Sequence, residues 1–228
     1  VMLRRPPRSR PGVSSAASDV YKRDVASISP ELFFQKGDFR GKNNVIVSKP
    51  MKGTMPRGQT SDEDKILFNK LKHSNKDRAE NVMIVDLLRN DIARISQSGT
   101  VNVYKPFMIE CYKTVFQMTS MVTGQLESET KLINIFNALF PCGSITGAPK
   151  LSTMKYIEQL ESSPRSIYCG TIGMLLPEGR MVFNIPIRTI EYRNQCAIYG
   201  VGAGITIDSI PENEVQEFHA KTKILENL

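Results

Sequence analysis

The chain has 228 residues, of which 40% are hydrophobic and 23% charged, and its formal net charge is +7 at pH 7. This length suffices for one large domain or two small ones around a hydrophobic core. No apolar run approaches the ~20 residues of a membrane-spanning helix. No apolar segment follows the basic start, so we expect no secretory signal there. The composition therefore predicts a globular protein, which we expect in the cytoplasm.

The basic charge is concentrated at the start of the chain. Residues 1–24 hold six basic and two acidic side chains, so more than half of the net charge lies there. The segment Arg4–Pro11 is rich in Arg, Pro and Ser and cannot build a core. We predict a disordered head over residues 1–24 and an ordered domain over residues 25–228. Because aromatic residues do not interleave its charges, we expect no nucleic-acid partner, and no membrane partner either.

The cysteines and histidines narrow the possible chemistry. The four cysteines lie far apart without a C-x-x-C pair, so neither a zinc ribbon nor a disulfide framework is predicted. We expect reduced, mostly buried thiols. The two histidines stand in no motif, so catalysis is expected to rest on other side chains. These residues are Cys111, Cys142, Cys169 and Cys196, and His73 and His219.

The first half of the chain predicts strands followed by two helices and further strands. Acidic residues directly after Ser61 favour a helix start there, because they interact well with the positive end of the helix dipole. A long helical pattern then runs from Lys76 to Ile95. The predicted strands are Ala26–Phe34, Asn44–Lys49, Val101–Val103 and Tyr112–Val122.

The second half predicts helices at Leu132–Leu139 and Leu151–Leu160, and a last helix from Pro211 to about Leu225. Between them lie three consecutive strand patterns, which suit an antiparallel meander. Strands do not alternate regularly with helices, so the fold class predicted is α+β with mainly antiparallel sheets. The three strands are Ile167–Leu175, Met181–Ile190 and Cys196–Val201.

Lys52 is the first candidate for chemistry. It stands between a strand end at Lys49-Pro50 and Gly53, in a segment that Pro and Gly hold on a short turn. Such a lysine can contact an anion, or act as a nucleophile when its surroundings lower its pKa. A solvated surface lysine is the alternative.

Two glycine-rich segments are further candidates. Pro141–Lys150 offers glycines, two hydroxyls and a lysine before a helix start, where backbone N–H groups bind anions. It is not a Walker A loop, because Ala148 and Pro149 interrupt that motif. Gly200–Ile205 lacks the third glycine of a dinucleotide fingerprint, so we interpret it as a glycine-rich strand or bulge. A structural turn and a close approach of two strands are the alternatives.

Acidic pairs occur on two predicted helices. Asp77 and Glu80 are three residues apart on one, and Glu214 and Glu217 on the other, so each pair shares a helix face. If the two faces meet, their oxygens suit Mg²⁺. Two solvated helix faces are the alternative, and spacing alone does not decide between them.

Arg188 and Tyr168 lie within apolar strand patterns. A strand arginine needs a partner if it is buried. A ligand carboxylate would supply one with bidentate geometry, and a structural ion pair is the alternative.

Together these segments resemble the chorismate-utilising enzymes, from Ser29-Pro30-Glu31-Leu32 to the C-terminus. The markers occur in the order typical of that family. They are Pro50–Gly58, Ala79–Asp91, Phe140–Lys150, Tyr168–Gly173, Ile187–Thr189, Gly202–Ile205 with Asp208 and Ser209, and the acidic last helix.

The resemblance implies a role for each candidate. Glu80 and Glu217 would bind Mg²⁺ directly, and Asp77 and Glu214 through water. Arg188, Tyr168 and the backbone of Gly202, Ala203 and Gly204 would hold the enolpyruvyl carboxylate of chorismate. Ser144 would contact the substrate, and Glu31 would protonate the departing 4-hydroxyl. The implied fold is a sandwich of antiparallel sheets with flanking helices.

Lys52 assigns the chain to one branch of that family. Anthranilate, isochorismate and salicylate synthases usually have a small residue there, whereas the aminodeoxychorismate branch has lysine. The resemblance implies that Lys52 attacks C2 of chorismate and that ammonia, from a glutamine amidotransferase subunit, then expels it from C4. The product would be 4-amino-4-deoxychorismate, a precursor of p-aminobenzoate and folate.

Two departures from the family pattern leave alternatives open. Gln117 stands where many relatives have histidine, so it is open which group handles protons on that side. Family members also carry further strands before the region matched here, so we expect residues 25–228 to be a partial domain with open sheet edges. An anthranilate synthase with an unusual lysine and a non-catalytic fragment are the alternative interpretations.

Overall fold

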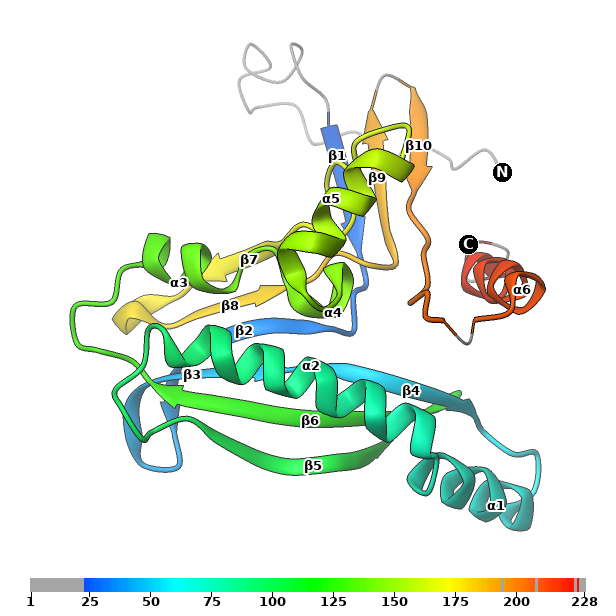
Figure 1. Cartoon of the computed structure of the whole chain (residues 1–228), viewed down its shortest axis with the longest axis horizontal. Helices are drawn as coiled ribbons and strands as arrows, with labels where there is room; N and C mark the ends of the chain where they lie inside the picture. The colour runs from blue at the N-terminus through cyan, green and yellow to red at the C-terminus, as the bar shows by residue number, and fades with distance from the viewer. Residues whose placement is uncertain (1–22, 194, 208, 224, 226–228) are drawn as a thin grey trace, which may run out of the picture. The chain divides into compact units, whose positions relative to one another are not determined.

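The computed structural model describes residues 23–193, 195–207, 209–223 and 225 (Figure 1). Residues 1–22 of the predicted head, and Asp208 among the family markers, lie outside the described residues. Strand β1 (Arg23–Ser27) already begins at Arg23. Arg23 and Asp24, which were predicted to lie in the head, thus belong to this strand.

The contacts between residues divide the chain into two compact units. The larger unit is Pro30–Pro186, and the smaller combines the residues up to Ser29 with those from Ile187 onward. The sequence predicted one domain over residues 25–228. That domain stays a prediction. Because β1 pairs with a strand more than 150 residues later in the chain, the smaller unit contains residues from both ends.

The larger unit is built on a seven-stranded sheet in which every pairing is antiparallel. Strand β6 pairs with three other strands. Along one edge it pairs with β4 and then β3, and along the other with β5. Strand β3 continues the sheet to β2, β8 and β7. The strands are β2 (Leu32–Phe39), β3 (Lys42–Lys49), β4 (Met51–Pro56), β5 (Asn102–Cys111), β6 (Val115–Gln125), β7 (Ile172–Leu175) and β8 (Met181–Asn184).

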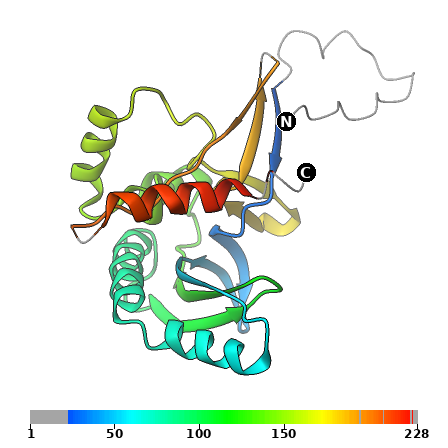
Figure 2. The same ribbon diagram turned by 90° about the vertical axis from the view of Figure 1, so that its right-hand side faces the viewer.

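Helices α1 (Ser61–Lys72) and α2 (Asn75–Ala93) start where side chains cap them. Thr60 and Glu63 form a capping box at the start of α1, which confirms the helix start predicted at Ser61. Ser74 accepts a hydrogen bond from the backbone N–H of Asp77 at the start of α2. Helix α2 runs along the sheet over β6 and β4 (Figure 1), and Figure 2 shows it nearly end-on beside the strands.

The core of the larger unit fills the space between this sheet and its helices. Ile84, Leu88 and Ile92 recur along one face of α2 and are fully buried against the sheet. At the other end, α3 (Leu132–Leu139) places Phe136 within 5.9 Å of Phe34, centroid to centroid, in an edge-to-face pair. Two short helical segments follow, α4 (Gly143–Thr146) and α5 (Lys150–Leu160).

The smaller unit holds a three-stranded antiparallel sheet in the order β1, β9 (Thr189–Arg193), β10 (Cys196–Tyr199). The hydroxyls of Ser27 and Thr189 lie 2.8 Å apart and join the end of β1 to the start of β9. The last helix, α6 (Pro211–Thr222), begins at the proline that the sequence indicated.

Helices and antiparallel strands together confirm the α+β class, but several predicted strands differ from those observed. Ala26–Phe34 is split between β1 and β2, and in Tyr112–Val122 strand β6 begins only at Val115. In Ile167–Leu175 only β7 is a strand, because the chain turns before it with left-handed backbone at Cys169. Met181–Ile190 is split between β8 and β9, which belong to different sheets. Gly200–Ile205 forms no strand in the described residues. A sandwich of the two sheets stays a prediction, because they belong to different units.

Among the described residues, none of the helices combines the length and the apolar content that crossing a membrane requires.

Candidate active site

Lys52 sits in a β-bulge of strand β4. Met51 pairs with Thr119 and Thr54 with Gln117, so two residues of β4, Lys52 and Gly53, face one residue of β6. Gly53 has a left-handed φ of 87°, and a Cβ there would lie 2.9 Å from Cβ of Asp77 on α2. Glycine is therefore required beside Lys52, both for the backbone conformation and for the close approach of α2.

The structure brings Lys52 together with two other predicted site residues, Glu31 and Ser144. Glu31 precedes β2 and is only 7% exposed. Its carboxyl group interacts with the Ser144 hydroxyl of α4 and with the positive charge of Lys52. Burial outweighs both and raises the pKa of Glu31 above its ordinary value of 4.5. A carboxyl group that keeps its proton nearer to neutral pH suits a general acid.

We expect the raised pKa of Glu31 to make the folded state less stable as the pH rises. The neutral form contributes stability that is fully present below pH 4.5 and is lost as the pH rises through the folded-state pKa. In Glu31→Gln this loss is absent, so the unfolding free energy of the variant relative to wild type should increase across that window. The increase should be about 1.4 kcal/mol for each unit by which the pKa is raised.

Urea unfolding of wild type and Glu31→Gln between pH 4 and pH 8 measures this difference. Glu129→Gln, at an exposed position, is the control and should show a constant difference from wild type. A constant difference for Glu31→Gln as well would contradict a raised pKa at Glu31.

A buried thiol lies beside these groups. Cys142, 3% exposed, has its Sγ 3.3 Å from the Ser144 Oγ. Burial first, and then the nearby charge of Glu31, raise the pKa of Cys142 to about 12. The thiol is thus protonated at neutral pH and is no nucleophile there. This agrees with the prediction of reduced, buried cysteines for Cys142 and Cys169, whereas Cys111 and Cys196 are exposed.

The loop that carries Ser144 is anchored on α2. A Cβ on Gly143 would collide with the Leu87 side chain, so glycine is required for α4 to approach α2. At the end of the loop, Lys150 Nζ lies 2.5 Å from the Asp91 carboxylate, which is 4% exposed. Arg94 bonds Asp91 at 3.0 Å and also the carbonyl of Ala138. The lysine of this motif is therefore used in a structural ion pair and is not free for an anion.

The acidic pairs lie on helices of different units. Asp77 and Glu80 occupy the first turns of α2, both partly exposed, and Asp77 contacts the Lys52 bulge through Gly53. Within the described part of the chain no group of three or more His, Cys, Asp or Glu side chains is placed to hold a metal ion. The donor chemistry nevertheless fits Mg²⁺, because carboxylate oxygens are its preferred protein ligands.

On α6, Glu217 forms an ion pair with Lys221 at 2.5 Å, and Lys221 also donates to the carbonyl of Gly202 at 2.7 Å. Lys221 thus links the predicted metal ligand Glu217 to the predicted substrate-binding glycine segment. Glu214 lies one turn earlier and is partly exposed. Sequence reasoning missed Lys221, although its i, i+4 spacing from Glu217 was a visible signal.

Arg188 and Tyr168 also lie in different units. Arg188 has a left-handed φ of 49°, and its positive charge acts on the hydroxyl of Tyr199. No salt bridge of Arg188 occurs among the described residues, so the structural ion pair considered as the alternative is not found there. Tyr168 lies beside Cys169 in the turn before β7, and burial raises its pKa, so its hydroxyl stays protonated.

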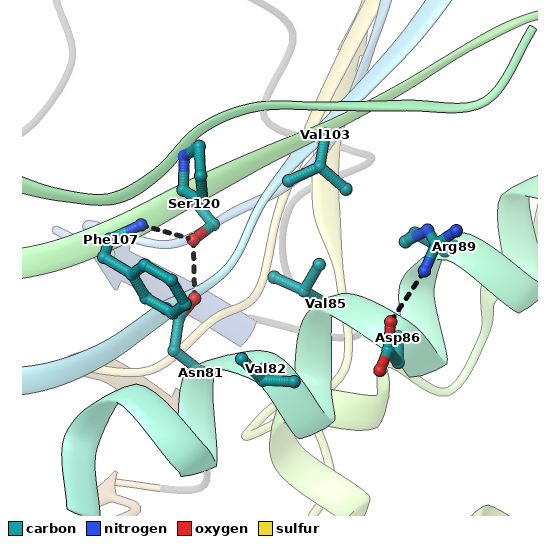
Figure 3. Close-up of a pocket in the computed structure, with 9 residues that line it drawn as sticks. Asn81, Val82, Val85, Asp86, Arg89, Val103, Phe107 and Ser120 are labelled. Atoms are coloured by element: carbon teal, nitrogen blue, oxygen red, sulfur yellow. Dashed lines mark hydrogen bonds and ion pairs between the residues drawn. The ribbon is translucent and has the colours of Figure 1, made fainter. Parts of the chain in front are cut away.

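A pocket of about 150 Å³ lies on another side of α2, between this helix and strands β5 and β6 (Figure 3). Its lining is mainly apolar. The Ser120 hydroxyl donates to the amide oxygen of Asn81 at 2.5 Å and accepts from the N–H of Phe107 at 3.1 Å. Figure 3 marks both hydrogen bonds with dashed lines. None of the predicted site residues lines this pocket. The candidate site is therefore identified from the contacts among Glu31, Lys52 and Ser144 and not from a pocket.

Comparison with known proteins agrees with the family markers. A family described as chorismate binding enzyme matches residues 2–227, so the match includes most of the basic head. Aminodeoxychorismate synthase component 1 from Bacillus subtilis is 43% identical over 193 residues, which are 85% of this chain and 40% of that protein. Anthranilate synthase component 1 from Aquifex aeolicus is 40% identical over 201 residues, 88% of this chain and 40% of that protein.

The solved structure of anthranilate synthase component I from Streptococcus pneumoniae is similar as well. It superposes with a TM-score of 0.77 at 37% sequence identity, covering 88% of this chain and 43% of that one. The chain thus spans less than half the length of these relatives.

Proposed function

Because the chain belongs to the chorismate binding enzyme family, we propose that it is the part of an aminodeoxychorismate synthase component 1 that carries the nucleophile and the general acid. The observation that carries the proposal is Lys52, held on a bulge beside the buried carboxyl group of Glu31. The proposed reaction converts chorismate and ammonia into 4-amino-4-deoxychorismate and water. The Bacillus subtilis relative, 43% identical over 193 residues, carries that name.

The mechanism proposed for Lys52 has two substitutions. Its neutral amine attacks C2 of chorismate, the ring double bond shifts, and the 4-hydroxyl leaves as water with the proton of Glu31. Ammonia then adds at C4, the double bond returns, and the bond from C2 to Lys52 breaks. The amine regains its free form and Glu31 regains a proton from the incoming ammonia. Covalent catalysis of this kind divides one difficult substitution into two easier ones.

The side chains around Glu31 support this role. A neutral carboxylic acid can donate a proton to the leaving hydroxyl, and burial raises the pKa of Glu31 and so favours its neutral form. The Ser144 hydroxyl, which interacts with Glu31, fixes the direction of the carboxyl group from the anchored loop. We assign Ser144 to the substrate contact as well.

We further propose that Asp77, Glu80, Glu214 and Glu217 hold Mg²⁺. When bound, the ion would neutralise the ring carboxylate of chorismate. Asp77 and Glu80 share α2, and Asp77 borders the Lys52 bulge, so this half of the ligand set lies near the nucleophile. The assignment of Glu214 and Glu217 rests on the family resemblance. The same holds for Arg188, Tyr168 and the backbone of Gly202–Gly204 at the enolpyruvyl carboxylate, where a guanidinium group suits bidentate binding.

A glutamine amidotransferase subunit is the proposed source of ammonia. The names of relatives contain "component 1", which agrees with a second component. Anthranilate synthase is the second candidate function, because the Aquifex aeolicus protein is almost as similar as the Bacillus subtilis one.

Product analysis separates the two functions. We expect the intact protein to form 4-amino-4-deoxychorismate when it is incubated with chorismate, ammonium and Mg²⁺, as chromatography with mass detection would show. Anthranilate as the main product would overturn the proposed function in favour of the second candidate.

The same assay tests the metal assignment. Glu80→Gln should require a higher Mg²⁺ concentration for half-maximal rate, because a neutral amide is a poorer ligand than a carboxylate. Asp86→Asn, on another turn of α2 and paired with Arg89, is the control and should leave the Mg²⁺ requirement unchanged. An unchanged requirement in Glu80→Gln would remove this residue from the ligand set.

A further inference from the structure

Gln117 of β6 is hydrogen-bonded to both residues that follow Lys52. Its amide nitrogen donates to the carbonyl of Gly53 at 2.8 Å, and its amide oxygen accepts from the Thr54 hydroxyl at 2.8 Å. The side chain is 6% exposed. Two good hydrogen bonds from a buried amide fix its position and orientation.

These bonds hold the part of β4 where the regular ladder is interrupted. Within the bulge, Lys52 and Gly53 have no regular partner on β6, so the strand pairing itself does not fix them. The Gln117 side chain replaces the missing ladder bond by reaching the Gly53 carbonyl. From the other side, Asp77 of α2 closes on Gly53. The peptide after Lys52 is therefore held between an amide and a helix.

The same geometry limits what else Gln117 does. A carboxamide does not titrate at the pH of enzymes, and its amide oxygen and one of its N–H groups are used on β4. Gln117 therefore holds the backbone of β4 and cannot relay a proton.

We propose that Gln117 is a positioning residue for Lys52, which it keeps directed at Glu31 through the Gly53 peptide and the Thr54 hydroxyl. This inference rests on the proposed function for its effect on catalysis. Its structural part, that Gln117 controls where the Lys52 amine lies, does not depend on the reaction. A displacement of about 1 Å in a reacting group can lower a rate by about 10²-fold.

The test compares two glutamines of the same strand. Gln117→Met keeps the length of the side chain and removes both hydrogen bonds. Gln125→Met is the matched control, because Gln125 also donates its amide to a backbone carbonyl, that of Asn43 at 2.6 Å, at the far end of β6. Thr54→Val is a milder variant at an exposed position, which removes only the hydroxyl that orients Gln117.

The first measurement does not need turnover. A trace of acetic anhydride labels the amines of the intact protein, and peptide mass spectrometry gives the ratio of label on Lys52 to label on Lys49, an internal reference at the end of β3. We expect this ratio to rise severalfold in Gln117→Met and less in Thr54→Val, because the released amine leaves the half-buried site. Gln125→Met should keep the wild-type ratio.

The second measurement is steady-state amination of chorismate. In Gln117→Met kcat should fall by about 10²-fold while KM changes far less, because the misplaced group acts in the transition state. An unchanged labelling ratio in every variant that folds, Thr54→Val included, overturns the positioning role. If wild type does not aminate chorismate, the proposed function fails, and the labelling ratio still decides the position of Lys52.

Discussion

Lys52→Ala should abolish formation of 4-amino-4-deoxychorismate while chorismate still binds. We expect kcat to fall by roughly 10³-fold or more, because the covalent route loses its nucleophile and no neighbouring group replaces it. Chorismate affinity should change little, since the carboxylates of the substrate are assigned to Arg188, to the Gly202–Gly204 backbone and to Mg²⁺. Rapid quench with product detection gives the rate, and calorimetry with chorismate gives the affinity.

Lys49→Ala is the control for Lys52→Ala. Lys49 ends β3 three residues before Lys52, and its ammonium lies 2.5 Å from the Glu110 carboxylate in a partly exposed ion pair. Removing such a pair costs up to about 1 kcal/mol of stability and touches no site residue. Amination should therefore stay near the wild-type rate in Lys49→Ala. A wild-type rate in Lys52→Ala would exclude the covalent role and leave Lys52 as an anion contact.

Local sequence patterns predicted those parts of the fold that local interactions determine. The start of α1 followed from acidic residues after Ser61, and α3 has the predicted bounds Leu132–Leu139. The start of α6 followed from Pro211. In each case the helix depends on residues within one or two turns of its end, so a short window contains the cause.

Features that depend on distant pairing were not predictable in this way. An apolar, β-branched run over Met181–Ile190 looks like one strand, yet β8 pairs with β2 and β9 with β1. The break falls between the two compact units, directly after Pro186. That proline was the one signal in the run, because a proline inside a strand pattern argues against a continuous strand. The glycines of Gly200–Ile205 likewise suggested a strand or a bulge, and the structure has no strand there.

In the candidate site, too, the sequence indicated some residues and not their distant contacts. The resemblance pointed to Glu31, Lys52 and Ser144, and the structure of the larger unit brings these three together. The resemblance drew attention to Gln117 only as a departure and to Asp91 only as the end of a marker. Neither pattern nor resemblance indicated what these two residues contact, because each acts across more than 50 residues of sequence. Gln117 holds the Lys52 bulge across 64 residues, and Asp91 holds Lys150 across 59. The sequence does not show which group the Gln117 amide or the Asp91 carboxylate contacts.

The second large effect, a loss of stability, is expected when the contact between Asp91 and Lys150 is removed. Asp91 is 4% exposed and accepts from Lys150 and Arg94, and the Lys150 ammonium is itself only 15% exposed. Asp91→Ala leaves a buried ammonium with one further bond, to the carbonyl of Leu139 at 3.4 Å. Removing one partner of a buried pair costs about 3–5 kcal/mol, because the remaining charge is uncompensated. We expect a loss of that size in the unfolding free energy, measured with urea.

Two further variants show whether the stability loss comes from the unpaired buried charge or from replacing any aspartate of α2 by alanine. Asp86→Ala removes an Asp–Arg pair with the same i, i+3 spacing on the same helix, but both its side chains are more than half exposed, so the cost should stay below about 1 kcal/mol. Asp91→Ala combined with Lys150→Met removes both buried charges and should regain most of the stability that Asp91→Ala loses. Equal costs for Asp86→Ala and Asp91→Ala would mean that the Ser144 loop is held by packing on Leu87 and not by the ion pair.

Because that loop also directs the Glu31 carboxyl, the stability lost in Asp91→Ala should be accompanied by a lower rate of amination. The double variant should regain more of the stability than of the rate.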